Sequence, residues 1–415
     1  MKYFVVIFLF SFVFYSCEDE SDIVYPDTDP DDILEHVTLL NENSKMIMEG
    51  IYEIIKGTEE FGEKAVIKWN QNHLNIFFAK NAGYIAMQGG AIDSILLFKG
   101  YWRHLVNTNT GVVNFIIDKD SGYVDIINGN SLDTNIVLSG KYGKGKSLPE
   151  FPIMLKYLRP ISETARYNTF YIMGHRCGGR NAEQLGVSEN SVDMIRKSVE
   201  LGVNGIEMDV RTSEDNIQFI YHDNDVNLRL TQPSLLIGKI ESYTFAELRS
   251  FLKLANGEKI PSLKEALEEV LKQPHIKLVW LDCKSEKNDV QMIRDIQKEF
   301  MDRAAAMGRE LKIMMGIPEE EKFNQVKGLS GFNSILTLCE LDLTKVRELN
   351  SEFWGSRWTE GIQQDKINEM HSEGRKVISW TLDEPLFIQQ YVENANFDGI
   401  LSNYPPLVAY YHYMQ

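Results

Sequence analysis

Several polar side chains that could do chemistry close short apolar runs in the second half of the sequence. Glu207 and Asp209 are one residue apart, so both carboxylates point to the same face of a strand. Two such carboxylates repel each other unless a cation lies between them, and Ca2+ and Mg2+ prefer oxygen ligands. Asp282 and Lys284 share a face of a later strand in the same way. We therefore expect Glu207, Asp209 and Asp282 to hold Ca2+ or Mg2+, with Lys284 at a phosphate oxygen; the alternative is a charge network without metal.

Two histidines end further apolar runs, in the pairs His175-Arg176 and His222-Asp223. Imidazoles titrate near neutral pH, so one can activate an attacking oxygen while the other protonates a leaving alkoxide. The planar, permanently charged fork of Arg176 suits phosphate oxygens. A single histidine at a strand end is more often structural, but a pair beside an arginine and a diacid favours catalysis. We expect Asp223 to shape its strand end and to orient His222.

These side chains need a scaffold that gathers the ends of several strands. From about residue 170 onward, nine strand-like segments alternate with amphipathic segments of helical period. Such alternation predicts a parallel α/β fold, and its length favours a (β/α)8 TIM barrel, whose catalytic groups lie at the C-terminal strand ends. Nine segments are one too many for eight strands. We expect the additional one to lie between residues 311 and 358.

The same region resembles the glycerophosphodiester phosphodiesterase family over about residues 170–406. The resemblance lies in the ordered blocks MGHRCGGRNAEQLGVSENS (173–191), GIEMDVRTSEDNIQFIYHD (205–223), WLDCK (280–284), VISWTLDE (377–384) and FDGILSNYP (397–405). Several blocks in the family's order are far more specific than one short motif. Two positions depart from the family pattern: Cys177 stands for a glycine, and Asp282 stands for a glutamate, whose arm is longer by about 1.5 Å.

The resemblance implies metal-dependent hydrolysis of a glycerophosphodiester to glycerol 3-phosphate and an alcohol. It implies these roles: His175 and His222 as the acid and base, Glu207, Asp209 and Asp282 as metal ligands, and Arg176 and Lys284 as phosphate contacts. Glu189 would lie in the substrate-binding pocket and support the first block by hydrogen bonding, and Trp380 would form a wall of that pocket. Two alternatives stay open. One is a related phosphodiesterase that acts on a phosphoinositide or another lipid head group, and the other is a non-catalytic binding protein of the cell envelope.

The composition restricts the partners. The formal net charge of −17 argues against nucleic-acid binding, which needs a basic face to displace counterions. A small phosphodiester remains compatible with this charge, because a bound cation reverses the local field.

The first residues have the pattern of an exported lipoprotein. Residues 1–16 combine Lys2 with an apolar run too short to span a bilayer, which predicts a signal peptide. Cys17 follows a small residue, as in a bacterial lipobox, and its acylation would tether the protein to a membrane. Residues 17–34 are strongly acidic and predict a solvated linker. We therefore expect an outer-membrane lipoprotein of the bacterial cell envelope, facing the periplasm or exposed at the surface.

Between the linker and the predicted TIM barrel, the sequence has period two. We assign residues 35–150 to a small antiparallel all-β domain, a barrel or sandwich, and residues 151–415 to the phosphodiesterase barrel. The boundary falls in KYGKGKSLPEFP (141–152), which is rich in glycine, proline and lysine. The β-domain's aromatic residues Trp69, Phe77, Phe78 and Trp102 predict a core rather than a ligand cup, although a module that binds an unknown ligand or partner is the alternative.

Overall fold

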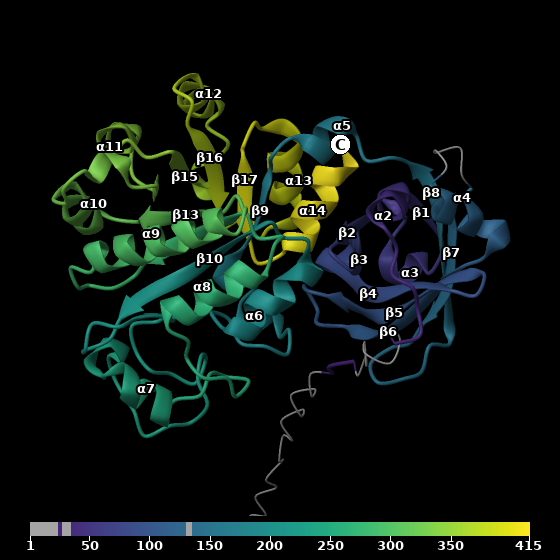
Figure 1. Cartoon of the computed structure of the whole chain (residues 1–415), viewed down its shortest axis with the longest axis horizontal. Helices are drawn as coiled ribbons and strands as arrows, with labels where there is room; N and C mark the ends of the chain where they lie inside the picture. Colours follow the sequence, from purple (N-terminus) through teal and green to yellow (C-terminus); the bar gives the residue numbers. More distant parts are fainter. Residues whose placement is uncertain (1–23, 27–34, 130–134) are drawn as a thin grey trace, which may run out of the picture.

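The computed structural model describes residues 24–26, 35–129 and 135–415. The predicted signal peptide (1–16), Cys17 and nearly all of the acidic linker (17–34) lie outside these residues. Within the described part of the chain, no helix is long and apolar enough to cross a membrane. Two closed barrels follow each other along the sequence and lie side by side (Figure 1).

The N-terminal barrel is antiparallel and each strand pairs with the next, while the last strand closes on the first. Its strands are β1 (Gly50–Lys56), β2 (Lys64–Asn70), β3 (His73–Phe78), β4 (Gly83–Ile92), β5 (Ile95–His104), β6 (Thr110–Ile117), β7 (Val137–Tyr142) and β8 (Phe151–Arg159), with short helices α2 (Glu42–Met48), α3 (Thr58–Phe61) and α4 (Tyr123–Asn128). The predicted small antiparallel domain is therefore confirmed as an eight-stranded barrel.

The predicted boundary after residue 150 is wrong. Strand β8 lies beyond it and pairs with both β7 and β1, so the first barrel ends at Arg159. The segment rich in glycine, proline and lysine is the turn between β7 and β8. Turn residues of this kind occur both in hairpins and in linkers between domains, so composition alone does not separate the two.

The aromatic residues of the β-domain are buried. Phe78, Trp102 and Trp69 belong to the interior core of the first barrel. Phe77 is adjacent to Phe78 in β3 and therefore points to the opposite face. That face packs against the second barrel, where the ring of Phe77 approaches Gly202.

The second barrel is parallel, and its eight strands close through the pairing of β9 with both β17 and β10. The strands are β9 (Tyr171–Gly174), β10 (Gly205–Thr212), β12 (Leu278–Cys283), β13 (Lys312–Ile317), β14 (Thr337–Cys339), β15 (Phe353–Arg357), β16 (Lys376–Trp380) and β17 (Gly399–Ser402). The helices are α5 (Glu163–Tyr167), α6 (Val192–Lys197), α7 (Phe245–Phe251), α8 (Leu263–Lys272), α9 (Val290–Ala306), α10 (Glu320–Lys327), α11 (Leu343–Glu348), α12 (Gln364–Ser372), α13 (Pro385–Asn394) and α14 (Pro405–Met414). The predicted TIM barrel is confirmed.

The ninth candidate strand is β11 (Gln218–Ile220), and it forms an antiparallel hairpin with β10. The expectation that the additional segment lies between residues 311 and 358 is therefore wrong. Only five residues, 213–217, separate β10 from β11. A parallel crossover needs about a dozen residues, so this connection can only reverse the chain.

The first barrel contributes strands β2–β5 to the contact between the two barrels. The second barrel contributes α14 and the 3-10 turn Ser198–Leu201. The side-chain amides of Asn70 and Asn75 donate to the carbonyl oxygen of Val199 at 3.1 and 2.8 Å. Tyr101 in β5 bonds to Glu200 and Lys197 of the second barrel. The contact is therefore polar and specific as well as apolar.

Strand alternation sorts the interior of the TIM barrel into two layers. The lower layer is apolar and includes Met173, Trp280, Leu338, Phe353 and Ile378. Residues two positions further along the same strands share the inward face at the C-terminal mouth. This upper layer is the polar one, and it contains the residues that the sequence singles out for chemistry.

Candidate active site

Three carboxylates on two adjacent strands meet at the barrel mouth. Glu207 and Asp209 point inward from β10, and the parallel register places Asp282 of β12 directly beside Asp209. One carboxylate oxygen from each residue lies within 4.8 Å of one from each of the other two. One oxygen of each, namely Glu207 Oε1, Asp209 Oδ1 and Asp282 Oδ1, is buried without a hydrogen-bond partner among the described residues. Three converging carboxylates with unpartnered oxygens fit a hard divalent cation. The shorter arm of Asp282 still reaches the cluster.

The charges around this cluster are unbalanced. Burial and the charges of Asp209 and Asp282 raise the pKa of Glu207 well above its ordinary value. Burial acts in the same direction on Asp209, but Lys284 and nearby cationic groups outweigh it and lower the pKa of that carboxyl. The Lys284 ammonium lies 2.5 Å from Asp282 Oδ2 and 3.7 Å from Asp209 Oδ1. Two carboxylates on one ammonium leave residual negative charge, which a bound cation would neutralise.

His175 follows β9 and is held in one orientation by Asn403, which follows β17. The His175 Nδ1 atom lies 2.9 Å from Asn403 Oδ1. The Asn403 amide nitrogen donates to Asp383 Oδ2 at 2.6 Å, so its oxygen must face the imidazole. An amide oxygen only accepts, and therefore Nδ1 carries the proton and Nε2 presents a lone pair. That Nε2 atom lies 3.8 Å from Glu207 Oε2.

The environment keeps the His175 ring neutral. Burial, followed by the adjacent charge of Arg176, lowers the pKa of His175 to about 3. A neutral imidazole with a free Nε2 can accept a proton from a reacting group.

Arg176 lies close to three carboxylates, those of Glu207, Glu189 and Asp209. Its backbone N–H donates to Glu207 Oε2 at 2.8 Å, and Nη1 pairs with Glu189 Oε1 at 2.7 Å. Its Nε atom lies 4.0 Å from Asp209 Oδ2 and has no hydrogen-bond partner among the described residues. Arg176 and Cys177 both have positive φ, 52° and 75°, a region that glycine adopts more readily. The strained turn points the Arg176 N–H at the carboxylate cluster.

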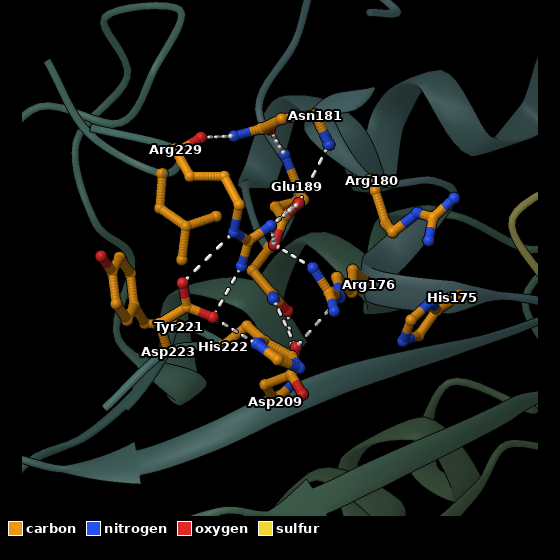
Figure 2. Close-up of polar contacts among 12 residues, drawn as sticks. His175, Arg176, Arg180, Asn181, Glu189, Asp209, Tyr221, His222, Asp223 and Arg229 are labelled. Atoms are coloured by element: carbon orange, nitrogen blue, oxygen red, sulfur yellow. Dashed lines mark hydrogen bonds and ion pairs between the residues drawn. The ribbon is translucent and has the colours of Figure 1, made fainter. Parts of the chain in front are cut away.

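His222 follows β11, which pairs with β10, and Asp223 orients its ring. The His222 Nδ1 atom lies 2.6 Å from Asp223 Oδ1, so Nε2 is the nitrogen left for substrate. The Arg229 guanidinium donates to Asp223 Oδ1 at 2.7 Å and to Glu189 Oε2 at 3.2 Å (Figure 2). Burial raises the pKa of Asp223, but hydrogen bonds from Arg229, His222 and Asn227 outweigh burial and hold it well below its ordinary value.

This network joins the two histidine loops. Glu189 accepts hydrogen bonds from Arg176 on one side and Arg229 on the other, and from the Asn181 N–H at 2.9 Å. Glu189 is 2% exposed, so the link is buried. It therefore lies behind the site as a brace and does not line the open mouth.

Trp380 ends β16 on the inward face, where its ring packs edge-on against Trp280 at a centroid distance of 6.2 Å. The Arg357 guanidinium stacks over Trp380 at 4.9 Å. The indole thus forms part of the wall opposite the carboxylates. This is the place where the sequence predicts a substrate-pocket residue.

The structure brings all the described residues singled out from the sequence to one end of one barrel. It adds residues that the sequence reasoning missed: Asn190, which donates to Asp209 Oδ2 at 2.7 Å; Asn403 and Asp383 behind His175; and Arg229 behind Asp223. Asn190 lies in the sequence block SENS and Asn403 in the block SNYP. Their places within these blocks are the only signal in the sequence that could have identified them.

The family model described as "Glycerophosphoryl diester phosphodiesterase family" matches residues 175–407. Glycerophosphodiester phosphodiesterase 1 of Mus musculus is 30% identical over 137 residues, which are 31% of this chain and 38% of that protein. A glycerophosphodiester phosphodiesterase of Caldanaerobacter subterraneus subsp. tengcongensis is 23% identical over 56% of this chain and 94% of that protein. The chain thus spans under two fifths of the mouse relative's length.

Two solved structures are similar to part of this chain. One is a glycerophosphodiester phosphodiesterase from Parabacteroides distasonis, 21% identical, with a TM-score of 0.45 over 57% of this chain and 94% of that one. The other is a phosphodiesterase from Oleispira antarctica in complex with the product sn-glycerol-3-phosphate. It is 19% identical, with a TM-score of 0.42 over 57% of this chain and 94% of that one.

Proposed function

This chain belongs to the glycerophosphoryl diester phosphodiesterase family, and from that membership we propose that it hydrolyses glycerophosphodiesters to glycerol 3-phosphate and an alcohol. The observation that carries the proposal is the convergence of Glu207, Asp209 and Asp282 between two histidines at one barrel mouth.

The three carboxylates would hold the divalent cation, Ca2+ or Mg2+. When bound, it supplies a Lewis acid that gathers charge from a non-bridging phosphate oxygen. Lys284 and the free Nε side of Arg176 add fixed positive charge beside the same phosphate. Lys284 and Arg176 therefore stabilise the additional negative charge of the transition state.

The histidines move the protons. One imidazole takes the proton of the attacking oxygen, which is either water or the substrate's own glycerol hydroxyl. The other gives a proton to the departing alkoxide as its bond to phosphorus breaks. Asn403 and Asp223 each bond to Nδ1, so both Nε2 atoms remain for this exchange. If the glycerol hydroxyl attacks, water then opens the cyclic phosphate, and the net reaction is the same hydrolysis.

The test is release of glycerol 3-phosphate from glycerophosphocholine by the purified protein, with and without EDTA. We expect EDTA to abolish release and added Ca2+ or Mg2+ to restore it. Full activity of either His175→Ala or His222→Ala would contradict the proposal.

We also propose that acylation of Cys17 anchors the protein in the cell envelope. Support comes from the sequence, in which an apolar leader precedes a small residue and a cysteine. Metabolic labelling with a fatty acid should mark the wild-type chain and leave Cys17→Ser unlabelled. Equal labelling of both would contradict the anchor.

A further inference from the structure

The part of the barrel mouth formed by β14 and β15 holds two charged groups that the hydrolytic mechanism does not use. Glu340 directly follows β14, and Arg357 ends β15. Leu338 and Phe353 face the barrel interior, so strand alternation places Glu340 and Arg357 on the same inward face. Both therefore face the substrate side of the barrel.

Glu340 carries a carboxylate without a partner. Its Oε1 atom is buried, and no described residue donates a hydrogen bond to it. Burial, followed by the charge of Asp282, raises the pKa of Glu340 well above its ordinary value, while Lys284 and Arg357 act in the opposite direction. A buried acceptor of this kind costs about 1–3 kcal/mol unless a ligand satisfies it.

Arg357 is the matching free cation. Its guanidinium stacks on Trp380 at 4.9 Å, and among the described residues it forms neither a hydrogen bond nor an ion pair. Glu340 and Arg357 line the same cavity, yet no ion pair joins them.

Gly355 of β15 allows the neighbouring side chains to pack closely at this place. A Cβ atom there would come within 2.7 Å of Leu338 Cδ2, 3.0 Å of Glu340 Cγ and 3.2 Å of Trp380 Nε1. A cavity of about 590 Å³ reaches Glu340, Gly355 and Arg357 from the rim between α11 and α12.

Other charged groups of this cavity already have partners. Asp342 caps α11 by accepting from the Thr344 N–H at 2.8 Å, and Arg347 pairs with Glu373 at 2.5 Å. Lys366 lies over the Trp354 ring at 6.0 Å, whereas Arg357 lies over Trp380, which ends β16 on the inward face. Glu340 and Arg357 are therefore the charged groups of this cavity that strand alternation places on the barrel side.

We propose that this half of the mouth binds a zwitterionic alcohol arm of the phosphodiester, one that carries both an ammonium and a carboxylate, as a serine arm does. The ammonium donates to Glu340, and the carboxylate meets the fork of Arg357. An ethanolamine arm satisfies Glu340 alone, and a neutral glycerol arm brings no charge to either residue. The inference rests on the proposed hydrolysis and names the alcohol that is released.

The test compares kcat/KM of the metal-loaded full chain for glycerophosphoserine, glycerophosphoethanolamine and glycerophosphoglycerol. We expect the order serine, ethanolamine, glycerol, with about tenfold or more between the first and the last, on the scale of one charge-assisted hydrogen bond. Glu340→Gln should lower the serine and ethanolamine values at least tenfold and leave glycerol within twofold. Arg357→Gln should lower the serine value alone. The surface variants Glu348→Gln and Arg294→Gln, matched in chemistry, should change none.

Equal rates on the three substrates, or variants that lower all three by the same factor, would overturn this inference. Calorimetric titration of His222→Ala with glycerophosphoserine and glycerophosphoglycerol separates recognition from turnover. Tighter binding of the serine compound, lost in the double variant with Glu340→Gln, supports the inference even if hydrolysis itself fails. Equal affinity for both compounds overturns it. Release of glycerol 3-phosphate from glycerophosphoglycerol, whose alcohol arm carries no charge, reports the proposed function independently of the charge recognition.

Discussion

The Nδ1 atom of His175 lies 2.9 Å from the side-chain oxygen of Asn403, although 228 positions separate the two residues in the sequence. The neighbouring strands β9 and β17 close the barrel and bring them together. Since Asp383 holds the other side of the amide, this contact fixes the proton on Nδ1 and leaves Nε2 facing the carboxylates.

Asn403→Ala should therefore damage catalysis without emptying the metal site. The ring of His175 loses both its orientation and its preferred tautomer, and we expect kcat to fall about 10- to 100-fold, as for other residues that orient a functional histidine. Steady-state kinetics with saturating metal measures this, with Asn368→Ala on α12 as the control. An unchanged kcat would show that Asn403 does not position His175.

Glu207→Gln should have opposite effects on the metal-free and the metal-loaded protein. Glu207 is buried beside two other carboxylates, so removing its charge should leave Tm unchanged or raise it when EDTA is present. In the wild type, a cation at 100 times its Kd should add about 2.7 kcal/mol of stability, and Glu207→Gln should lose this gain. Thermal unfolding with and without Ca2+ or Mg2+ measures both effects, and Glu299→Gln on α9 is the control. A variant with the wild-type metal response would refute the assigned site.

Arg229→Ala should change how stability depends on pH. Arg229 helps to hold the pKa of Asp223 in the folded protein below its ordinary value of about 3.9. Because of this difference, the ionised Asp223 carboxylate stabilises the fold at pH values above about 3.9. This contribution disappears as pH falls toward the folded-state pKa. The gap in Tm between wild type and variant should therefore be largest above about pH 4 and narrow below it. A gap that stays constant from pH 2 to 7 would contradict this role, and Arg294→Ala serves as the control.

Glu49→Gln should weaken the contact between the barrels. Glu49 precedes β1 and pairs with Lys68 and Arg166, each at 2.5 Å. Both cations are largely buried, and they would lose their shared counter-charge. We expect a loss of about 2–4 kcal/mol in the free energy of unfolding by urea, toward the lower end because water partly screens the cations. As the control, Glu348→Gln removes one half of a pair with Lys327 that is exposed on both sides, and it should cost less than about 0.5 kcal/mol. Equal losses in the two variants would contradict the assignment.

Strand alternation made the core of the site predictable. Glu207, Asp209 and Asp282 follow directly from period two and from the register of two parallel strands. The same reasoning failed for β11, because a short apolar run has the same pattern in a hairpin as in a barrel strand. Asn403 and Arg229 escaped detection because each acts on a partner, and the contact of Asn403 exists only once the barrel closes.

The central claim is that two histidines and three carboxylates at one barrel mouth hydrolyse a glycerophosphodiester. The most direct measurement is the rate of glycerol 3-phosphate release by the metal-loaded wild type, His175→Ala and His222→Ala, with His371→Ala on α12 as the control. We expect each site variant to lose at least about 100-fold in kcat, the scale of acid–base catalysis, while the control keeps the wild-type rate. Wild-type rates in either site variant, or release that persists in EDTA, would contradict the claim.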